Sequence, residues 1–402
     1  MNFLIFLVNE GLTKIIPFIT ILIVANKIDV NSYGELTLYY IIFELLTILI
    51  SNNIKATTRI DFFKLSKSRY LISKKAHIVN SILLLFAILI FSLFIDTIPW
   101  IYILILSVTS LMRSVSYFVL SDLQCKENAK LYGLYNLLPI LFSNLFFIIF
   151  IYLGYGIESW FYTMFAGTFI QFLFILQYIY KNNYFSLDTN LKLSIPLIYT
   201  EFKNGVIFMP QAFGFWLGAA ADRLIISEVL GTLYVGYYMF VFQLSTPIII
   251  FSTVVNLYLT PKLNYYIKQH QSTQIKIIFF KFLLLTLIFS VLTFIVIQFV
   301  INYYYHKYIE ALSYVPYIVI ALYIQASYLI LMNLFYYVNK QKFVSILILI
   351  TSLIKVSSAY LAINLYNIYG LLYSNIFINS FILIFVLVQF KKSLKLLEIH
   401  NA

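Results

Sequence analysis

The chain has 402 residues, of which 62% are hydrophobic and only 10% are charged, and its formal net charge is +12. Soluble domains are about 45–50% apolar, so this composition excludes an ordinary soluble protein. The basic residues flank long apolar runs and do not gather on one folded surface, which excludes nucleic acid as a partner. With one cysteine, Cys125, and four histidines that share no ligand spacing, we expect no disulfide framework, metal site or cofactor.

A hydrocarbon core about 30 Å thick is crossed by roughly 20 helical residues. Windows of that size, taken in chain order, predict twelve transmembrane helices. They cover residues 3–26, 36–54, 77–95, 98–121, 131–153, 157–180, 204–230, 232–258, 277–302, 311–337, 343–365 and 369–390. The first of these runs is too long for the core of a signal peptide and lacks a basic N-terminal region, so we expect it to remain as a membrane helix.

Positive charge alternates between the gaps that separate these helices. Of the 27 lysines and arginines, 21 lie in alternate gaps or, like Lys281, in the helix turn next to one, Lys27 and Lys307 lie in the other gaps, and four lie deeper inside the helices. Because positively charged loops stay in the cytoplasm, both termini are predicted to be cytoplasmic. The gaps on the outer side are only a few residues long and leave no room for a catalytic domain, so we expect that the protein is not an enzyme.

The distribution of polar residues predicts two lobes. We expect an N-terminal six-helix lobe over 1–180, a cytoplasmic linker with an amphipathic segment over 181–203, a C-terminal six-helix lobe over 204–390 and a cytoplasmic tail over 391–402. A short repeat supports this division, since Gly34 and Gly236 follow similar residues near the starts of the second and eighth helices. Such repeats are typical of transporters with a site between two lobes, although a Tyr-Gly pair near a helix start also arises from loop chemistry.

Ionisable residues inside the bilayer are costly and normally face a polar interior. The first helix carries Glu10 and Lys14 at a spacing of four, which allows them to neutralise each other. Lys14 lies about 16 Å along its helix, near the midplane. Pro17, one turn later, is expected to kink the helix, as in helices that open and close a cavity.

The other internal charges lie on the predicted second, fourth, seventh and eleventh helices. Arg113 is predicted to lie about 13 Å deep and Lys355 about 18 Å deep. Asp222 and Arg223 are adjacent, so their side chains diverge by about 100° and at least one needs a partner on another helix. Glu44 is either a cation or proton site or the partner of a buried base.

The balance of these charges indicates the class of cargo. The four cations are the predicted substrate-binding residues Lys14, Arg113, Arg223 and Lys355. The three acids are the predicted gating or ion-coupling residues Glu10, Glu44 and Asp222. The cations are in excess and are least compensated around Lys355 and Arg113, which favours an anionic cargo such as a diphosphate. A bundle-internal ion pair remains the competing interpretation of each cation.

Aromatic residues make up 19% of the chain. Trp100 and Trp160 open the fourth and sixth helices at the predicted outer interface, where indole rings prefer to lie. Trp216, Tyr237 and Tyr238 could stack on sugar rings or simply pack against lipid and neighbouring helices.

Two segments resemble a known family. The run from Ala221 to Gly231, continuing to Val235–Tyr238, resembles the seventh and eighth helices of polysaccharide exporters. Lys14, Pro17 and Ser32–Gly34 resemble the first two helices of the same proteins. These are the O-antigen flippases of the multidrug/oligosaccharidyl-lipid/polysaccharide exporter superfamily.

The resemblance implies an all-α membrane protein with two six-helix lobes around a central cavity, in the bacterial inner membrane. It implies translocation of undecaprenyl-diphosphate-linked oligosaccharide by alternating access, with H⁺ or Na⁺ as the coupling ion if there is one. The implied partners are this lipid-linked oligosaccharide, the lipid bilayer, a glycan polymerase and a chain-length regulator. A cation-coupled multidrug exporter of the same superfamily is the first alternative, and a membrane-embedded glycan polymerase, which would need a large outer loop, is the second.

Overall fold

The computed structural model describes residues 2–94, 98–184, 193–269, 271–337 and 341–399. Every regular element in these ranges is a helix. Nine helical segments of the described ranges are long and apolar enough to cross a membrane. The prediction of an all-α, multi-pass membrane protein is therefore confirmed, whereas the count of twelve transmembrane helices stays a prediction.

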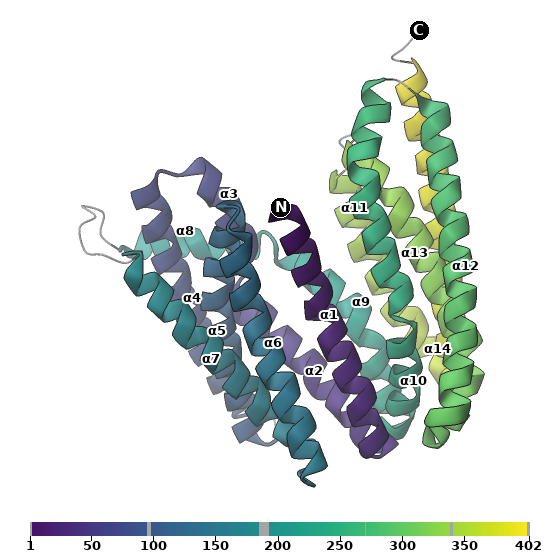
Figure 1. Cartoon of the computed structure of the whole chain (residues 1–402), viewed down its shortest axis with the longest axis horizontal. Coiled ribbons are helices and arrows are strands. Elements are labelled where there is room, and N and C mark those ends of the chain that lie inside the picture. The colour runs from purple at the N-terminus through teal and green to yellow at the C-terminus, as the bar shows by residue number, and fades with distance from the viewer. Residues whose placement is uncertain (1, 95–97, 185–192, 270, 338–340, 400–402) are drawn as a thin grey trace. The chain divides into compact units, whose positions relative to one another are not determined.

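Fourteen α-helices and one 3-10 helix follow one another along the chain (Figure 1). They are α1 (Asn2–Lys27), α2 (Val30–Ser51), α3 (Ile54–Lys64), α4 (Lys67–Ser92), α5 (Trp100–Cys125), α6 (Ala129–Tyr152), α7 (Ser159–Lys181), α8 (Ile195–Val206), α9 (Met209–Val229), α10 (Thr232–Ser245), α11 (Pro247–Lys268), α12 (Ser272–Tyr304), η1 (His306–Tyr314), α13 (Val315–Tyr337) and α14 (Gln341–Ile399).

Contacts divide the chain into two compact units. The first consists of Met1–Ile28 and Tyr39–Trp216, and the second of Asp29–Leu38 and Leu217–Ala402. The boundaries differ from the predicted lobes at two places, because the start of α2 belongs to the second unit and the start of α9 belongs to the first. The predicted linker contains α8, an element of the first unit, and its residues 185–192 lie outside the described ranges.

In the first unit, α6 packs against α1 and α7, and α5 packs against α4 and α7. An apolar core at one end of these helices includes Ile54, Phe118 and Ile175. Beside it the buried carboxylate of Asp122 accepts hydrogen bonds from two tyrosines and pairs with Lys126 at 2.7 Å. A carboxylate with this many donors can be buried without a large penalty.

The two predicted interface tryptophans differ in exposure. Trp100, the first residue of α5, is 44% exposed, as expected for an interfacial anchor. Trp160 near the start of α7 is only 7% exposed and packs edge-on against Phe43, with 6.1 Å between ring centroids. The expectation that Trp160 anchors the membrane interface is therefore wrong, because protein side chains cover its ring.

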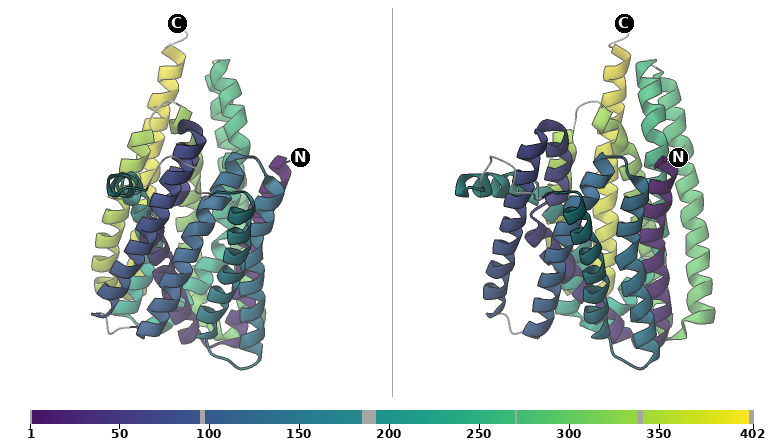
Figure 2. Two further views of the ribbon diagram at one scale, coloured as in Figure 1. Left: turned by 90° about the vertical axis from the view of Figure 1, so that its left-hand side faces the viewer. Right: turned by 60° about the vertical axis from the view of Figure 1, so that its left-hand side comes forward.

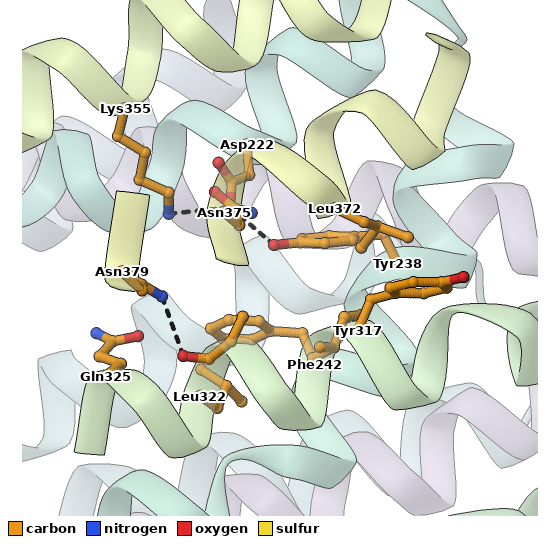
Figure 3. A pocket seen from close by; sticks show the side chains of 12 residues that line it. Asp222, Tyr238, Phe242, Tyr317, Leu322, Gln325, Lys355, Leu372, Asn375 and Asn379 are labelled. Atoms are coloured by element: carbon orange, nitrogen blue, oxygen red, sulfur yellow. Dashed lines mark hydrogen bonds and ion pairs between the residues drawn. The ribbon is translucent and has the colours of Figure 1, made fainter. Parts of the chain in front are cut away.

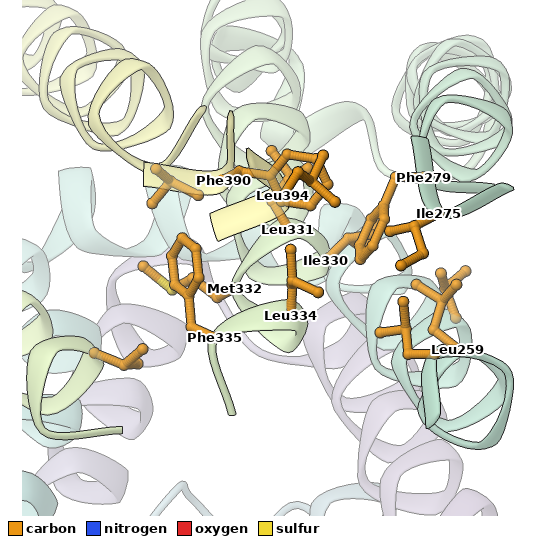
Figure 4. Close-up of a cluster of buried hydrophobic side chains, with 14 of the residues drawn as sticks. Leu259, Ile275, Phe279, Ile330, Leu331, Met332, Leu334, Phe335, Phe390 and Leu394 are labelled. Atoms are coloured by element: carbon orange, nitrogen blue, oxygen red, sulfur yellow. The ribbon is translucent and has the colours of Figure 1, made fainter. Parts of the chain in front are cut away.

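The core of the second unit lies where α11, α12, α13 and α14 meet (Figure 4). Leu259, Leu263 and Phe335 are completely buried there, and Phe279 packs edge-on against Phe390 at 4.9 Å between ring centroids. Side chains that interlock in this way hold membrane helices together through close packing, since lipid offers no hydrophobic gain for association.

The helix α14 contains both of the last two predicted spans, 343–365 and 369–390. Its backbone leaves helical geometry at Tyr366 and Asn367, where Asn367 has φ 53° and ψ −148°. A Cβ at Gly370 would lie 1.9 Å from the carbonyl oxygen of Ala362, so the chain makes a tight break there that only glycine allows. The break falls between the two predicted spans.

Candidate functional site

A buried carboxylate on α9 gathers polar groups from two other helices of the second unit, α10 and α14 (Figure 3). Oδ2 of Asp222 accepts hydrogen bonds from the Tyr238 hydroxyl at 2.7 Å, the Asn375 amide at 2.9 Å and the Lys355 ammonium at 3.1 Å. Lys355 also donates to the carbonyl oxygen of Gly218, one turn earlier on α9, at 3.1 Å. The carboxylate is 4% exposed, so this arrangement fixes the orientation of an otherwise costly buried charge.

A small cavity of about 20 Å³ adjoins this carboxylate. It holds about one water-sized group, since a water needs roughly 10–15 Å³ by this measure. Its polar walls are formed by Asp222, Tyr238, Tyr317, Gln325, Lys355, Asn375 and Asn379. Asn379 is held in place by donating to the carbonyl oxygen of Ala321 at 3.0 Å. Within the described part of the chain, Asp222 Oδ1 accepts no hydrogen bond, so the carboxylate keeps one acceptor atom available.

The expectation that Lys355 is poorly compensated is wrong, because its ammonium pairs with Asp222. Its side chain is only 20% exposed, and its depth in the bilayer stays a prediction. The expectation that Asp222 or Arg223 needs a partner on another helix is confirmed for Asp222. Arg223 is half-buried on the same helix and interacts electrostatically with the hydroxyls of Tyr33 and Tyr238.

A second cationic position lies in the first unit. The guanidinium of Arg113 on α5 lies 5.2 Å from the ring centroid of Phe43 and 5.6 Å from that of Tyr117. The negative charge of Glu44 on α2 acts on the same guanidinium. The ammonium of Lys55 lies 5.6 Å from the centroid of the same Tyr117 ring. Arg113 thus lies against two aromatic rings, a setting in which a delocalised cation is stabilised.

The first helix carries the remaining predicted residues. Lys14 is exposed on α1, and Pro17 lies inside that helix. The side chain of Glu10 lies outside the part of the structure that is described, so its predicted pairing with Lys14 stays a prediction. Within the first unit the structure brings Arg113 and Glu44 together, and within the second it brings Lys355 and Asp222 together.

Sequence reasoning overlooked the amides of the second-unit cluster. Asn375 and Asn379 lie four residues apart on α14, so both amides project from one face of that helix. Two asparagines at this spacing within an apolar helix are a signal that the sequence does carry. Tyr238, which was expected to stack on sugar rings or to pack against lipid and neighbouring helices, donates its hydroxyl hydrogen to Asp222. Trp216 donates its indole hydrogen to the carbonyl oxygen of Ile41 at 2.9 Å.

Comparison with known proteins gives structural but no sequence matches. No protein-family model matches the chain, and no curated protein matches it by sequence. Among solved structures, it resembles the inward-facing conformation of a multidrug resistance MATE family transporter of the MOP superfamily, with a TM-score of 0.69, 14% identity and coverage of 99% of this chain and 100% of that chain. The outward-facing conformation of such a transporter gives a TM-score of 0.62 at 12% identity, with coverage of 98% and 95%.

The lipid II flippase MurJ in an inward closed conformation is similar to the chain as well. The TM-score is 0.73 at 15% identity, and the match covers 98% of this chain and 90% of that chain. At such low identity these likenesses establish the fold alone. These neighbours are described as transporters and a flippase. The chain therefore shares its fold with a MATE transporter of the MOP superfamily and with MurJ, in agreement with the resemblance noted in the sequence.

Proposed function

We propose that the protein is a flippase that moves undecaprenyl-diphosphate-linked oligosaccharide across the bacterial inner membrane by alternating access. Both termini lie in the cytoplasm in this proposal, as the distribution of lysine and arginine predicts. The shared fold with a lipid II flippase supports a lipid-linked cargo. A glycan polymerase and a chain-length regulator are the partners that this function would require.

The observation that carries the proposal is the state of the internal acids. Asp222 already accepts three hydrogen bonds, one of them from Lys355, and Glu44 acts on Arg113. Each of these two acids has a base beside it, which weakens its attraction for a cationic cargo. The excess of bases favours an anionic headgroup, because phosphate oxygens accept strong charge-assisted hydrogen bonds from lysine and arginine.

The residues divide into two proposed roles. Lys14 and Arg113 bind the diphosphate, while Lys355 exchanges between Asp222 and the diphosphate, with Arg223 beside it on the outer side. When Lys355 leaves Asp222, the carboxylate must gain a proton or a Na⁺ ion to remain buried at low cost. Asp222, with Glu44 and Glu10, would in this way couple transport to an ion.

The same fold supports a second candidate, a cation-coupled multidrug exporter, because MATE transporters share it. The two candidates differ in the charge of the cargo. Inverted membrane vesicles that contain the protein should not accumulate a lipophilic cationic dye if the flippase proposal is correct. Dye accumulation that depends on Asp222 would favour the exporter.

The direct test is export of the lipid-linked repeat unit in a strain that depends on this protein. Lys14→Ala, Arg113→Ala and Lys355→Ala should each lower export at normal protein levels. Lys281→Ala is the matched control, because Lys281 is exposed on α12. Normal export by all three variants would reject the proposed binding residues.

A further inference from the structure

The helix α8 runs across the direction of its neighbours in the first unit, and it is seen end-on in the left view of Figure 2. It packs against α3 and α4. Three asparagine amides donate to its backbone: Asn80 to Ile198 O at 2.8 Å, Asn52 to Phe202 O at 3.1 Å and Asn53 to Gly205 O at 3.3 Å. These bonds attach both ends of α8 to the unit.

The side of α8 that faces α3 and α4 is polar and tightly fitted. Glu201 is 4% exposed, and its Oε2 lies 4.0 Å from Nδ1 of the completely buried His77. A Cβ at Gly205 would lie 2.2 Å from the carbonyl oxygen of Asn52. Only glycine permits so close an approach, so the helix is seated directly on the protein backbone.

The rest of α8 carries two stripes of opposite character. The apolar stripe consists of the exposed residues Ile195, Tyr199, Phe202 and Val206. The polar stripe consists of Thr200, Lys203 and Asn204. The spacing of four, three and four residues places the apolar stripe on one face of the helix. Ile195 is 82% and Tyr199 67% exposed, so the first unit leaves this face open.

The level of α8 along the unit agrees with a bilayer boundary. His77 is the first residue of the predicted span 77–95, and α2 ends at Ser51, immediately before the asparagines that hold α8. A helix that lies across the spans at their ends runs parallel to the membrane plane. In this orientation one side of α8 contacts the protein. Its apolar stripe faces the acyl chains and its polar stripe faces water.

We propose that α8 is an interfacial helix whose apolar stripe is inserted among the phospholipid headgroups and upper acyl chains of the bilayer. Helices with one apolar and one polar face bind this layer through buried apolar area, and tyrosine is favoured there. The third side of α8 is hydrogen-bonded to the rest of the first unit. The helix therefore couples this unit to the surface of the bilayer.

The single cysteine, Cys125, makes a labelling test feasible in a Cys125→Ser background. Spin labels are placed one at a time at the seven stripe positions of the full chain, in vesicles of phosphatidylethanolamine and phosphatidylglycerol. Labels at the apolar stripe should collide with oxygen, which concentrates in lipid. Labels at the polar stripe should collide with a water-soluble nickel chelate.

Two results would overturn the proposal. If the apolar stripe labels collide mainly with the nickel chelate, the helix lies in water. If they are inaccessible to both reagents, another part of the protein or a second copy covers the stripe. Thermal unfolding of each labelled protein, compared with the Cys125→Ser parent, confirms that the collisions are measured on folded protein.

Discussion

Gly34 on α2 lies against the backbone of the first residue of α10, and Gly236 on α10 lies against the backbone of the first residue of α2. A Cβ at Gly34 would lie 2.0 Å from the carbonyl oxygen of Thr232, the first residue of α10. A Cβ at Gly236 would lie 2.1 Å from that of Val30, the first residue of α2. The two helix starts cross in a reciprocal contact within the second unit, in which small residues allow the backbones to approach.

We predict that Gly236→Ala destabilises the protein by about 1–3 kcal/mol, because its methyl group must displace the backbone of α2. The matched control is Gly11→Ala in α1, where no described atom beyond the helix's own backbone and the neighbouring residues lies within 4 Å of the added Cβ. That change should be neutral or stabilising, since glycine in a helix interior costs about 0.5–1 kcal/mol relative to alanine. Thermal unfolding in detergent measures both, and equal midpoints for the two variants would contradict the prediction.

Close packing between the two helix starts therefore explains why a glycine stands at both positions of the repeat, whether or not the repeat arose by duplication. From the sequence, Gly34 and Gly236 indicated similar helix starts in two halves. The structure adds that the two starts touch, which a single sequence cannot show. A reciprocal contact of this kind is what an internal two-fold repeat produces, and the duplication stays a prediction.

We predict that Lys355→Met destabilises the protein by about 3 kcal/mol, because it leaves the Asp222 carboxylate buried without a cation. The double variant Lys355→Met with Asp222→Asn should recover most of this loss, since no charge is then left unpaired. Unfolding midpoints of the two single variants and the double variant give the coupling energy. A coupling near zero would mean that the two side chains do not depend on each other.

The membrane class and the break between the last two helices could be predicted because they follow from local composition and the thickness of the bilayer. The partner of Lys355 could not, because Asp222 is 133 residues away. The corner between α2 and α3 was also missed. Asn52 and Asn53 both adopt positive φ, 41° and 57°, which asparagine tolerates better than most residues. A pair of asparagines after a span is thus a local signal for such a corner.

We predict that Arg113→Ala lowers transport about tenfold, equivalent to about 1.4 kcal/mol of binding or barrier. Arg113→Lys should keep part of the transport, because the charge remains, but should lose the contacts of the planar guanidinium with Phe43 and Tyr117. Export assays and unfolding midpoints of both variants separate the two effects. If both variants transport normally, Arg113 serves only to pack the first unit.

The last prediction concerns the pH dependence of the α8 attachment. Burial raises the pKa of Glu201, but the neighbouring His77, whose Nδ1 lies 4.0 Å from Glu201 Oε2, and the positive charge of Lys74 outweigh burial, so the pKa lies below its ordinary value of 4.5. His77 Nε2 faces the carbonyl oxygens of Ser51 and Asn52, which only accept, so Nε2 carries a proton and Nδ1 is left to face Glu201.

A lowered pKa in the folded state means that ionised Glu201 stabilises the fold above about pH 4.5 and that this contribution is lost as the pH falls further. Lys74 is itself paired with Asp61 at 2.6 Å, so its charge is shared between two carboxylates. Glu201→Gln should lower the unfolding midpoint at neutral pH, and its difference from the wild type should shrink below pH 4.5. A difference that stays constant with pH would show that the charge of Glu201 does not hold α8, and that its shape and hydrogen bonds do so alone.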